Sequence, residues 1–332
     1  MRTNAIVFAI GTFIAASAAA NEADLSRDIL QKDGWTAYDV PLLAGAGAPC
    51  CYAHDMRRKC VLDGNNWITG TDDSDPHTKT DRTLTVYMHV DHGGVDKVRA
   101  FGSSCVVDDA DRARRIEHVA AADSIALLAQ LAQESGPREA LDESLAALSM
   151  HDDPGTVPTL SRLADASHPH KVREQALFWL GQNGGAEGAH VIEHVATTDA
   201  DDKLREQAVF DLSETKAVDG YDIIHRIAQT DHSPHVRSQA LFWMAQTQDK
   251  RAKADIVAAI EHDDSDQVRE QGVFALSQLK NDQADAALID IVRGNYPRKA
   301  KEQALFWLGQ SGSDAAMKFL DDMLTHQASK SN

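Results

Sequence analysis

The chain has 332 residues, with 51 acidic and 33 basic side chains and a formal net charge of −18. This acidic balance argues against a nucleic-acid partner, because phosphate binding needs clustered Lys and Arg, and against adsorption to anionic lipid. The charge favours solubility and says little about the fold.

The first twenty residues, 1–20, have the layout of a secretory signal peptide. Arg2 precedes an apolar run from Ala5 to Ala16, and small residues in A-x-A patterns follow. The pattern predicts cleavage before a mature start near Asn21 and a periplasmic or secreted location. An uncleaved membrane anchor is the alternative. The apolar run is too short for an ordinary membrane-spanning helix, so no membrane insertion is expected after cleavage.

Residues 21–110 have the character of a small β-rich domain. Strand-like runs occur at 35–43, 83–90 and 95–102. The last two are joined through Gly93 and Gly94, which predicts a β-hairpin. The stretch from residue 63 to residue 81 is rich in Gly, Asn and Asp and is expected to be a loop.

All four cysteines lie in this first third of the chain: Cys50, Cys51, Cys60 and Cys105. In an exported protein they predict two disulfide bonds, for which three pairings exist. A zinc site that includes His54 is the alternative, but the segment has no paired C-x-x-C spacing. The sequence therefore predicts no metal and no cofactor.

After about residue 110 the sequence repeats every 32 residues. A basic residue is followed two positions later by glutamine, three positions later by a small residue and five positions later by phenylalanine. The basic column is Arg173, Arg205, Arg237, Arg269 and Lys301. Each period holds two amphipathic stretches, and in the second Ala176, Leu177 and Leu180 share one helical face.

Aspartates at 199, 231 and 263 precede their arginines by six residues, where each is expected to cap the following helix and to accept from the arginine column. The period, the helix pairs and the Asp-then-Val-Arg signature resemble HEAT repeats, an α-solenoid family. The resemblance implies a mostly α protein with a right-handed solenoid of about six helix pairs over 118–327. A capping helix near 315–324 would close the stack, and a disordered tail would follow at 328–332. Repeats of this kind complete one another's cores.

No catalytic motif is apparent, because the chain lacks a P-loop, H-E-x-x-H and G-x-S-x-G. Deoxyhypusine hydroxylase resembles the chain in architecture, but it binds iron through His-Glu dipeptides, and none occurs here. The chain is therefore predicted not to be an enzyme. Histidines in two inter-helix turns are expected to be solvated: His168, His170, His232 and His235.

The second helix of each period presents a polar line opposite its core face. Gln175 and Gln182 point away from the core, and Phe178 and Trp179 flank them. In HEAT-like solenoids the second helices line the concave surface, so the resemblance implies a concave strip of amides edged with aromatic rings. An amide both donates and accepts and can pair with an extended peptide backbone. In the alternative reading, the rings fill gaps between repeats and the glutamines bind one another.

The sequence thus predicts a non-catalytic interaction scaffold or adaptor in the cell envelope, which binds a protein or an extended peptide on the concave face. It resembles secreted or periplasmic bacterial HEAT-repeat proteins. A metal-dependent sensor or enzyme that uses the N-terminal Cys/His domain is the alternative. The predicted partner-binding residues are Gln175, Phe178, Trp179, Gln182, Gln207, Gln239, Trp243, Gln246, Gln271, Gln278, Gln303, Trp307 and Gln310.

Overall fold

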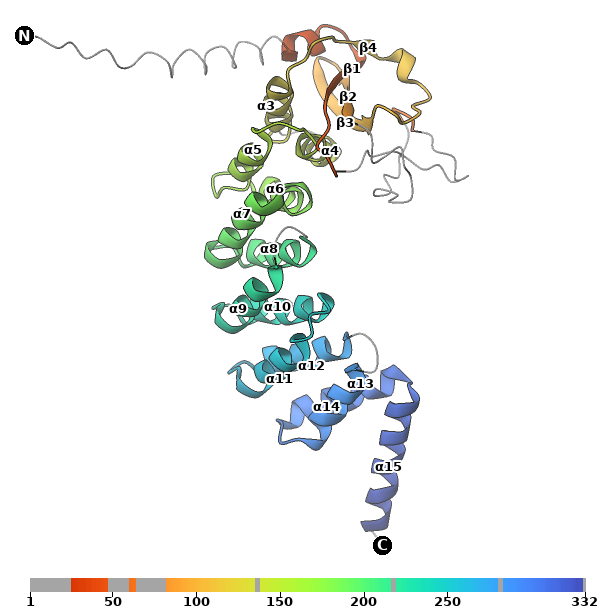
Figure 1. The fold of residues 1–332 in the computed structure, drawn as a ribbon, viewed down its shortest axis with the longest axis vertical. Coiled ribbons are helices and arrows are strands. Elements are labelled where there is room, and N and C mark those ends of the chain that lie inside the picture. The colour runs from red at the N-terminus through yellow and green to blue at the C-terminus, as the bar shows by residue number, and fades with distance from the viewer. Residues whose placement is uncertain are drawn as a thin grey trace, which may run out of the picture. The chain divides into compact units, whose positions relative to one another are not determined.

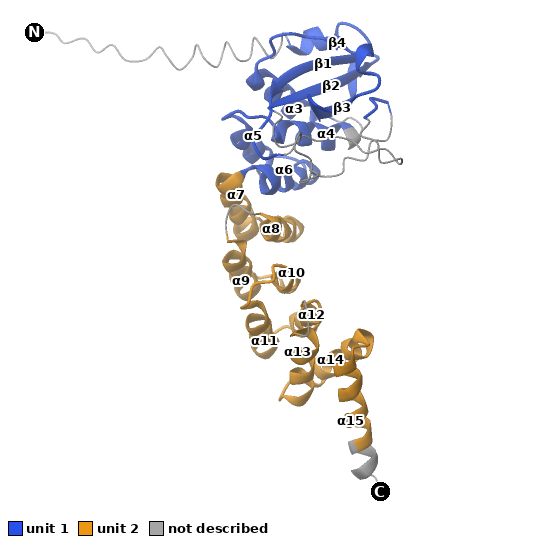
Figure 2. Cartoon of the chain, turned by 45° about the vertical axis from the view of Figure 1, so that its right-hand side comes forward, with its two compact units in different colours: residues 1–184 blue, residues 185–332 orange. Residues whose placement is uncertain are grey.

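The computed structural model describes residues 25–46, 60–63, 82–134, 138–215, 219–279 and 283–330. The predicted signal peptide, two cysteines at 50 and 51, and most of the predicted loop lie outside these ranges. The chain divides into an N-terminal unit, residues 1–184, and a C-terminal unit, residues 185–332 (Figure 2). No helix among the described residues is both long enough and apolar enough to cross a membrane.

The N-terminal unit contains a four-stranded sheet in the order β3-β2-β1-β4 (Figure 1). Strands β1, β2 and β3 pair antiparallel and confirm the three predicted strands, whereas the short β4 pairs parallel with β1. Strand β4 was not predicted, because two residues are too few to show an alternating pattern. The strands are β1 Gly34–Pro41, β2 Thr83–Asp91, β3 Gly94–Gly102 and β4 Arg114–Arg115.

The predicted hairpin between β2 and β3 is confirmed, and its turn explains the local sequence. His92 and Gly93 both have positive φ angles, of 52° and 78°. Two-residue hairpin turns of this kind need positive φ at both central residues, because only then does the turn match the twist of the strands. Gly93 takes this conformation without the steric cost that a side chain would add.

An apolar cluster on this sheet includes Trp35, Tyr87 and Phe101, and Cys60 is buried in it. Cys105 packs against the same cluster, and neither of these two cysteines is a free thiol. The two predicted disulfide bonds, and which of the three pairings they follow, stay a prediction.

The described residues between 121 and 311 form six consecutive helix pairs, followed by the last helix α15, Asp314–Lys330, in agreement with the predicted number. The first helices are α3 Ala121–Leu131, α5 Thr156–Leu163, α7 Gly185–Thr198, α9 Gly220–Thr230, α11 Ala252–His262 and α13 Gln283–Arg293. The second helices are α4 Arg138–Ser149, α6 His170–Asn183, α8 Asp202–Glu214, α10 Pro234–Gln246, α12 Asp266–Ser277 and α14 Arg298–Ser311.

Within the C-terminal unit the second helices form a continuous layer, in which α10 packs against α8 and α12, and α12 against α14 (Figure 1). The small-residue column allows this approach, since Ala208, Ala240 and Ala304 are fully buried. Each first helix buries branched residues against its own second helix, as Ile224 and Ile256 do. The core therefore follows the predicted columns.

Arginines connect successive repeats in this unit. Arg205 is almost fully buried and donates two hydrogen bonds to the Asp231 carboxylate, at 2.8 and 3.0 Å, and a third to the Asp199 carbonyl. Arg237 repeats the pattern with the Asp263 carboxylate and the Asp231 carbonyl. Each arginine thus donates to a backbone carbonyl in the turn that precedes its own helix. It also donates to the aspartate carboxylate in the corresponding turn of the next repeat.

The prediction that the aspartates at 199, 231 and 263 are the N-caps of the following helices is wrong. The N-cap residues of α8, α10 and α12 are Asp201, Ser233 and Ser265. The aspartates two positions earlier accept from the backbone N–H of those N-cap residues, as Asp263 does from Ser265 at 2.8 Å. Burial acts to raise the pKa of Asp263, but the hydrogen bonds from Arg237 and Ser265 outweigh it and lower that pKa.

We expect Gly272→Ala to destabilise the protein although the other periods have alanine in this column. A Cβ at Gly272 would lie 2.6 Å from Cγ1 of buried Ile260. Overpacking of this kind costs about 1–3 kcal/mol, more than the gain of about 1 kcal/mol in helix propensity. Urea denaturation measures the change in the free energy of unfolding.

The control for this substitution introduces Gly272→Ala into an Ile260→Ala background, where the steric conflict is absent. There the alanine should stabilise the protein through its helix propensity. A stabilising effect of Gly272→Ala in the otherwise unchanged protein would show that Ile260 adjusts without cost.

Candidate functional site

The predicted glutamine positions lie on the second helices, and their exposure varies. Three of the side chains are exposed: Gln182, Gln271 and Gln310. The others are half-buried: Gln175, Gln207, Gln239, Gln246, Gln278 and Gln303. None of these side chains is buried, but only three of the nine are exposed as the face argument predicted.

Most of these amides make no hydrogen bond to another of the described residues. Gln207 donates to Oδ1 of Asp211 at 2.9 Å, and Gln278 donates to Oγ of Ser277 at 3.0 Å. Among the described residues no hydrogen bond joins two of the predicted glutamines. The alternative in which the glutamines bind one another is therefore not what the structure shows.

Aromatic rings beside the glutamines form a continuous row in the C-terminal unit. Phe210 contacts Trp243 across the α8–α10 boundary, with ring centroids 4.8 Å apart. Phe242 and Phe274 stack across the α10–α12 boundary at 5.8 Å and an interplanar angle of 4°. We call this set the aromatic row, and it comprises Phe210, Phe242, Trp243, Phe274, Phe306 and Trp307.

The aromatic row continues to α14, where Phe274 contacts Trp307 at 5.1 Å. Phe306, at the end of the row, is 54% exposed, whereas the other members are half-buried. The rings therefore pack between repeats, as in the structural alternative, and still show part of their surface. In the N-terminal unit, Phe178 and Trp179 make an edge-to-face contact at 5.0 Å.

Two of the tryptophans hold a donor without an acceptor. The indole Nε1 of Trp179 and that of Trp307 are buried and have no hydrogen-bond partner among the described residues. A buried, unpaired N–H is costly, and tryptophans at interfaces usually pair this group. The two residues occupy the same position in their repeats, so the feature recurs with the sequence pattern.

Glutamates next to the glutamine column are paired with basic side chains. The partners lie within 3.4 Å: Lys171 for Glu174, His235 for Glu206, Lys299 for Glu270 and Arg298 for Glu302. Burial raises the pKa of Glu206, and the neighbouring His235 acts in the opposite direction. No glutamate of this column is placed as a base beside a nucleophile. We therefore interpret these glutamates as members of surface ion pairs.

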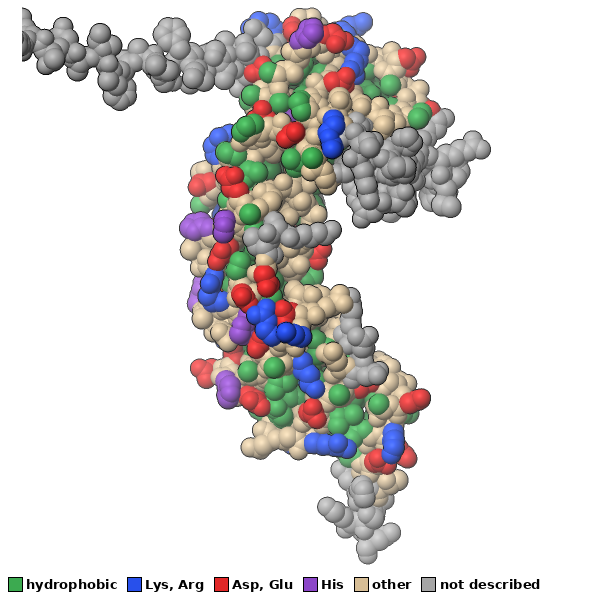
Figure 3. Space-filling model, viewed as in Figure 1, with side chains coloured by type: hydrophobic (Ala, Val, Ile, Leu, Met, Phe, Trp, Pro, Cys, Tyr) green, Lys and Arg blue, Asp and Glu red, His purple; other side chains and the backbone are tan. Residues whose placement is uncertain are grey.

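The turn histidines are exposed or hydrogen-bonded at the surface. His232 is 75% exposed beside Asp202, and His168 contacts Gln133 at 3.1 Å. Figure 3 shows histidine side chains along the side of the C-terminal unit where the first helices lie. Within the described ranges no group of three His, Cys, Asp or Glu side chains is arranged to hold a metal ion.

The N-terminal sheet, the alternative site, carries one polar cluster. His89 and Asp96 are 2.6 Å apart, and the His89 ring packs on Trp35 at 5.0 Å. The indole of Trp35 donates to Asp63, which also pairs with Arg112. Cys50, Cys51 and His54 lie outside the described residues, so the metal alternative stays a prediction.

Comparison with known proteins supports the repeat assignment. Residues 221–306, which span α9 to α14 up to Phe306, match the family model described as HEAT repeats. No curated protein matches the chain at a significant level of sequence similarity.

Similar solved structures include the YibA protein of Escherichia coli, at 17% identity and a TM-score of 0.37, which covers 61% of this chain and 76% of that one. Human deoxyhypusine hydroxylase aligns at 18% identity and a TM-score of 0.31, over 56% and 72% of the two chains. The CpcE–CpcF complex of phycocyanin lyase from Nostoc aligns at 18% and 0.29, over 60% and 81%. These low scores carry no argument about function. The family match identifies residues 221–306 of the chain as HEAT repeats.

Proposed function

We propose that the protein is an exported, non-catalytic scaffold that binds a protein partner along the layer of second helices. The most important observation is the set of unused amides beside the aromatic row. In the C-terminal unit, the side chains of Gln239, Gln271 and Gln303 make no hydrogen bond within the described residues. Each stands on a second helix next to rings that keep part of their surface accessible.

The chemistry of this surface suits an extended peptide segment. Amides that donate and accept can pair with backbone N–H and C=O groups without demanding a particular side chain. Rings already packed against each other lose little freedom on binding, and aromatic residues dominate many interfaces.

The export part of the proposal is supported by the N-terminal sequence and the cysteines. Arg2, the apolar run and the small residues before Asn21 favour a cleaved signal. Disulfide bonds that tie the β-rich domain would fit an oxidising compartment. The absence of a catalytic sequence motif supports a binding role rather than an enzyme.

We expect the triple substitution of Gln239, Gln271 and Gln303 by alanine to reduce capture of the partner at least tenfold, because each lost amide removes backbone pairing. The measurement is quantitative mass spectrometry of proteins retained by the immobilised mature chain from an envelope extract. The matched control replaces Gln267 and Gln283, which are exposed but lie outside the two glutamine columns. Unchanged capture by the triple variant, with circular dichroism showing a folded protein, would contradict binding through these amides.

A further inference from the structure

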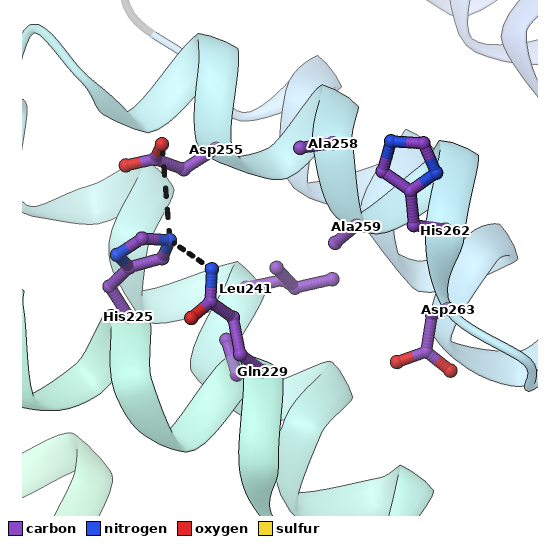
Figure 4. Close-up of a pocket in the computed structure, with 9 residues that line it drawn as sticks. His225, Gln229, Leu241, Asp255, Ala258, Ala259, His262 and Asp263 are labelled. Carbon is purple, nitrogen blue, oxygen red and sulfur yellow. Dashed lines mark hydrogen bonds and ion pairs between the residues drawn. The ribbon is translucent and has the colours of Figure 1, made fainter.

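A small pocket opens in the layer of first helices, on a different surface from the glutamine columns. It lies between α9 and α11 and has a volume of about 240 Å³. Figure 4 shows His225, Gln229 and Asp255 at one end of the pocket and His262 and Asp263 at the other. The surface between them consists of small or apolar side chains, among them Leu241.

The pocket exists because one column of the repeat contains an alanine. Positions 195, 227, 259 and 291 are equivalent in successive first helices, and three of them hold Val195, Ile227 and Ile291, all buried. The fourth is Ala259, which is half-buried and lines the pocket. Because Ala259 lacks a branched side chain, a space is left beside Leu241. In the other three repeats, the valine or isoleucine at the equivalent position occupies this space.

One carboxylate is held in a fixed orientation at the polar end. Tyr221 is 3% exposed, and its hydroxyl donates to Oδ2 of Asp255 at 2.6 Å. The His225 ring stacks on Tyr221, and its Nε2 lies 3.9 Å from Oδ1 of Asp255 and 2.9 Å from the amide nitrogen of Gln229. The 3.9 Å approach of His225 is the one polar contact of Oδ1 of Asp255 within the described ranges, and it is longer than a hydrogen bond; the carboxylate lies at the polar end of the pocket (Figure 4).

The arginines around the pocket already have acidic partners. Arg237 makes a bidentate contact with Asp263, and Arg251 pairs with Asp222 and Asp249. The contact between Arg237 and Asp263 also removes Asp263 as a free acceptor. Asp255, in a chain with an excess of acidic residues, is thus the carboxylate in the pocket that an external cation can reach.

We propose that this pocket binds a lysine side chain presented by another molecule. The alkyl stem would lie along Ala258, Ala259 and Leu241, and the ammonium would donate to Oδ1 of Asp255. Lysine fits better than arginine, because a guanidinium favours two carboxylate oxygens and Tyr221 already occupies Oδ2. An ammonium is a compact point charge that one oxygen can satisfy.

The proposal is tested with two small probes and the full chain. N-acetyl-lysine methylamide is expected to shift the imidazole resonances of His225 and the methyl resonances of Ala258 and Ala259 in NMR titrations. N-acetyl-norleucine methylamide has a similar stem without the charge, and it should bind at least about tenfold more weakly, a difference of 1.4 kcal/mol. Equal shifts with both probes would overturn recognition of a cation.

Two variants separate the charge from the shape of the pocket. Asp255→Asn keeps an acceptor for Tyr221 and removes the negative charge, so binding of the lysine probe should weaken about tenfold or more. Ala259→Ile installs the side chain of the equivalent position in α9 and α13, so the protein should stay folded and the shifts should disappear. Retained binding by folded Ala259→Ile would show that the probe does not occupy this pocket.

Discussion

Replacing Arg205 by alanine is expected to lower the free energy of unfolding by about 3–5 kcal/mol, the cost of breaking a buried ion pair. Arg205 is 1% exposed and Asp231 is 6% exposed, so the substitution leaves a buried carboxylate without its cation. It also removes the donors to the Asp199 carbonyl and to Asp202. Urea denaturation followed by circular dichroism measures the loss.

The matched control for Arg205 is Arg226→Ala. Arg226 also pairs with a residue of another repeat, Glu193, but it is 54% exposed. Exposed ion pairs contribute little, so the midpoint of denaturation should remain unchanged. An effect of Arg205→Ala as small as that of Arg226→Ala would contradict the role assigned to the buried arginines.

Acidification is expected to destabilise the N-terminal unit through His151. The side chain is 1% exposed, its Nδ1 donates to the Ala147 carbonyl, and its Nε2 accepts from Oγ of Ser124, each at 2.8 Å. Ser124 in turn accepts from the Tyr38 hydroxyl at 2.9 Å. A proton on Nε2 would reverse this chain of donors and place a charge in the core.

Burial lowers the pKa of His151 to about 4, although the hydrogen bond with Ala147 acts in the opposite direction. The unfolded chain has an ordinary histidine pKa, so between pH 6.5 and pH 4 unfolding takes up a proton. The free energy of unfolding therefore falls as the pH falls, by about 3 kcal/mol across this window. The contribution of His151 to stability is fully present at pH values above the pKa that this histidine has in the unfolded chain.

Denaturation at pH 7 and pH 4.5 tests this, with His151→Gln as the reference because carboxylates also titrate over the range. The wild-type protein should lose about 2–3 kcal/mol more than the variant does. Parallel pH profiles for the two proteins would show that His151 is not held neutral by the fold.

The periodic sequence determines most of what could be predicted. Columns spaced 32 residues apart place Ala208, Ala240 and Ala304 in the core. Alternation in β2 and the Gly93-Gly94 link to β3 mark the hairpin. Side-chain contacts between repeats were harder to foresee. The pairing of Arg205 with Asp231 joins residues 26 positions apart, which no local pattern reveals.

The candidate site was only partly predictable for the same reason. Sorting the positions of each second helix by face predicted that the glutamines lie outside the core. The same sorting could not decide whether the aromatic rings face solvent or one another. That depends on the distance between neighbouring helices, which brings Phe242 onto Phe274 and Phe210 onto Trp243. The pocket beside Ala259 had a visible signal, since that position holds alanine where the equivalent positions hold valine or isoleucine.

The most direct test of the scaffold proposal places a photoreactive benzoylphenylalanine at Gln271, which is exposed on a second helix. The reference position is Glu187, which is exposed on the first helix α7 and lies outside the pocket between α9 and α11. We predict that irradiation in the native envelope links Gln271, and not Glu187, to one discrete partner segment that peptide mapping identifies. No cross-link at Gln271, or the same products at both positions, would contradict a partner-binding layer of second helices.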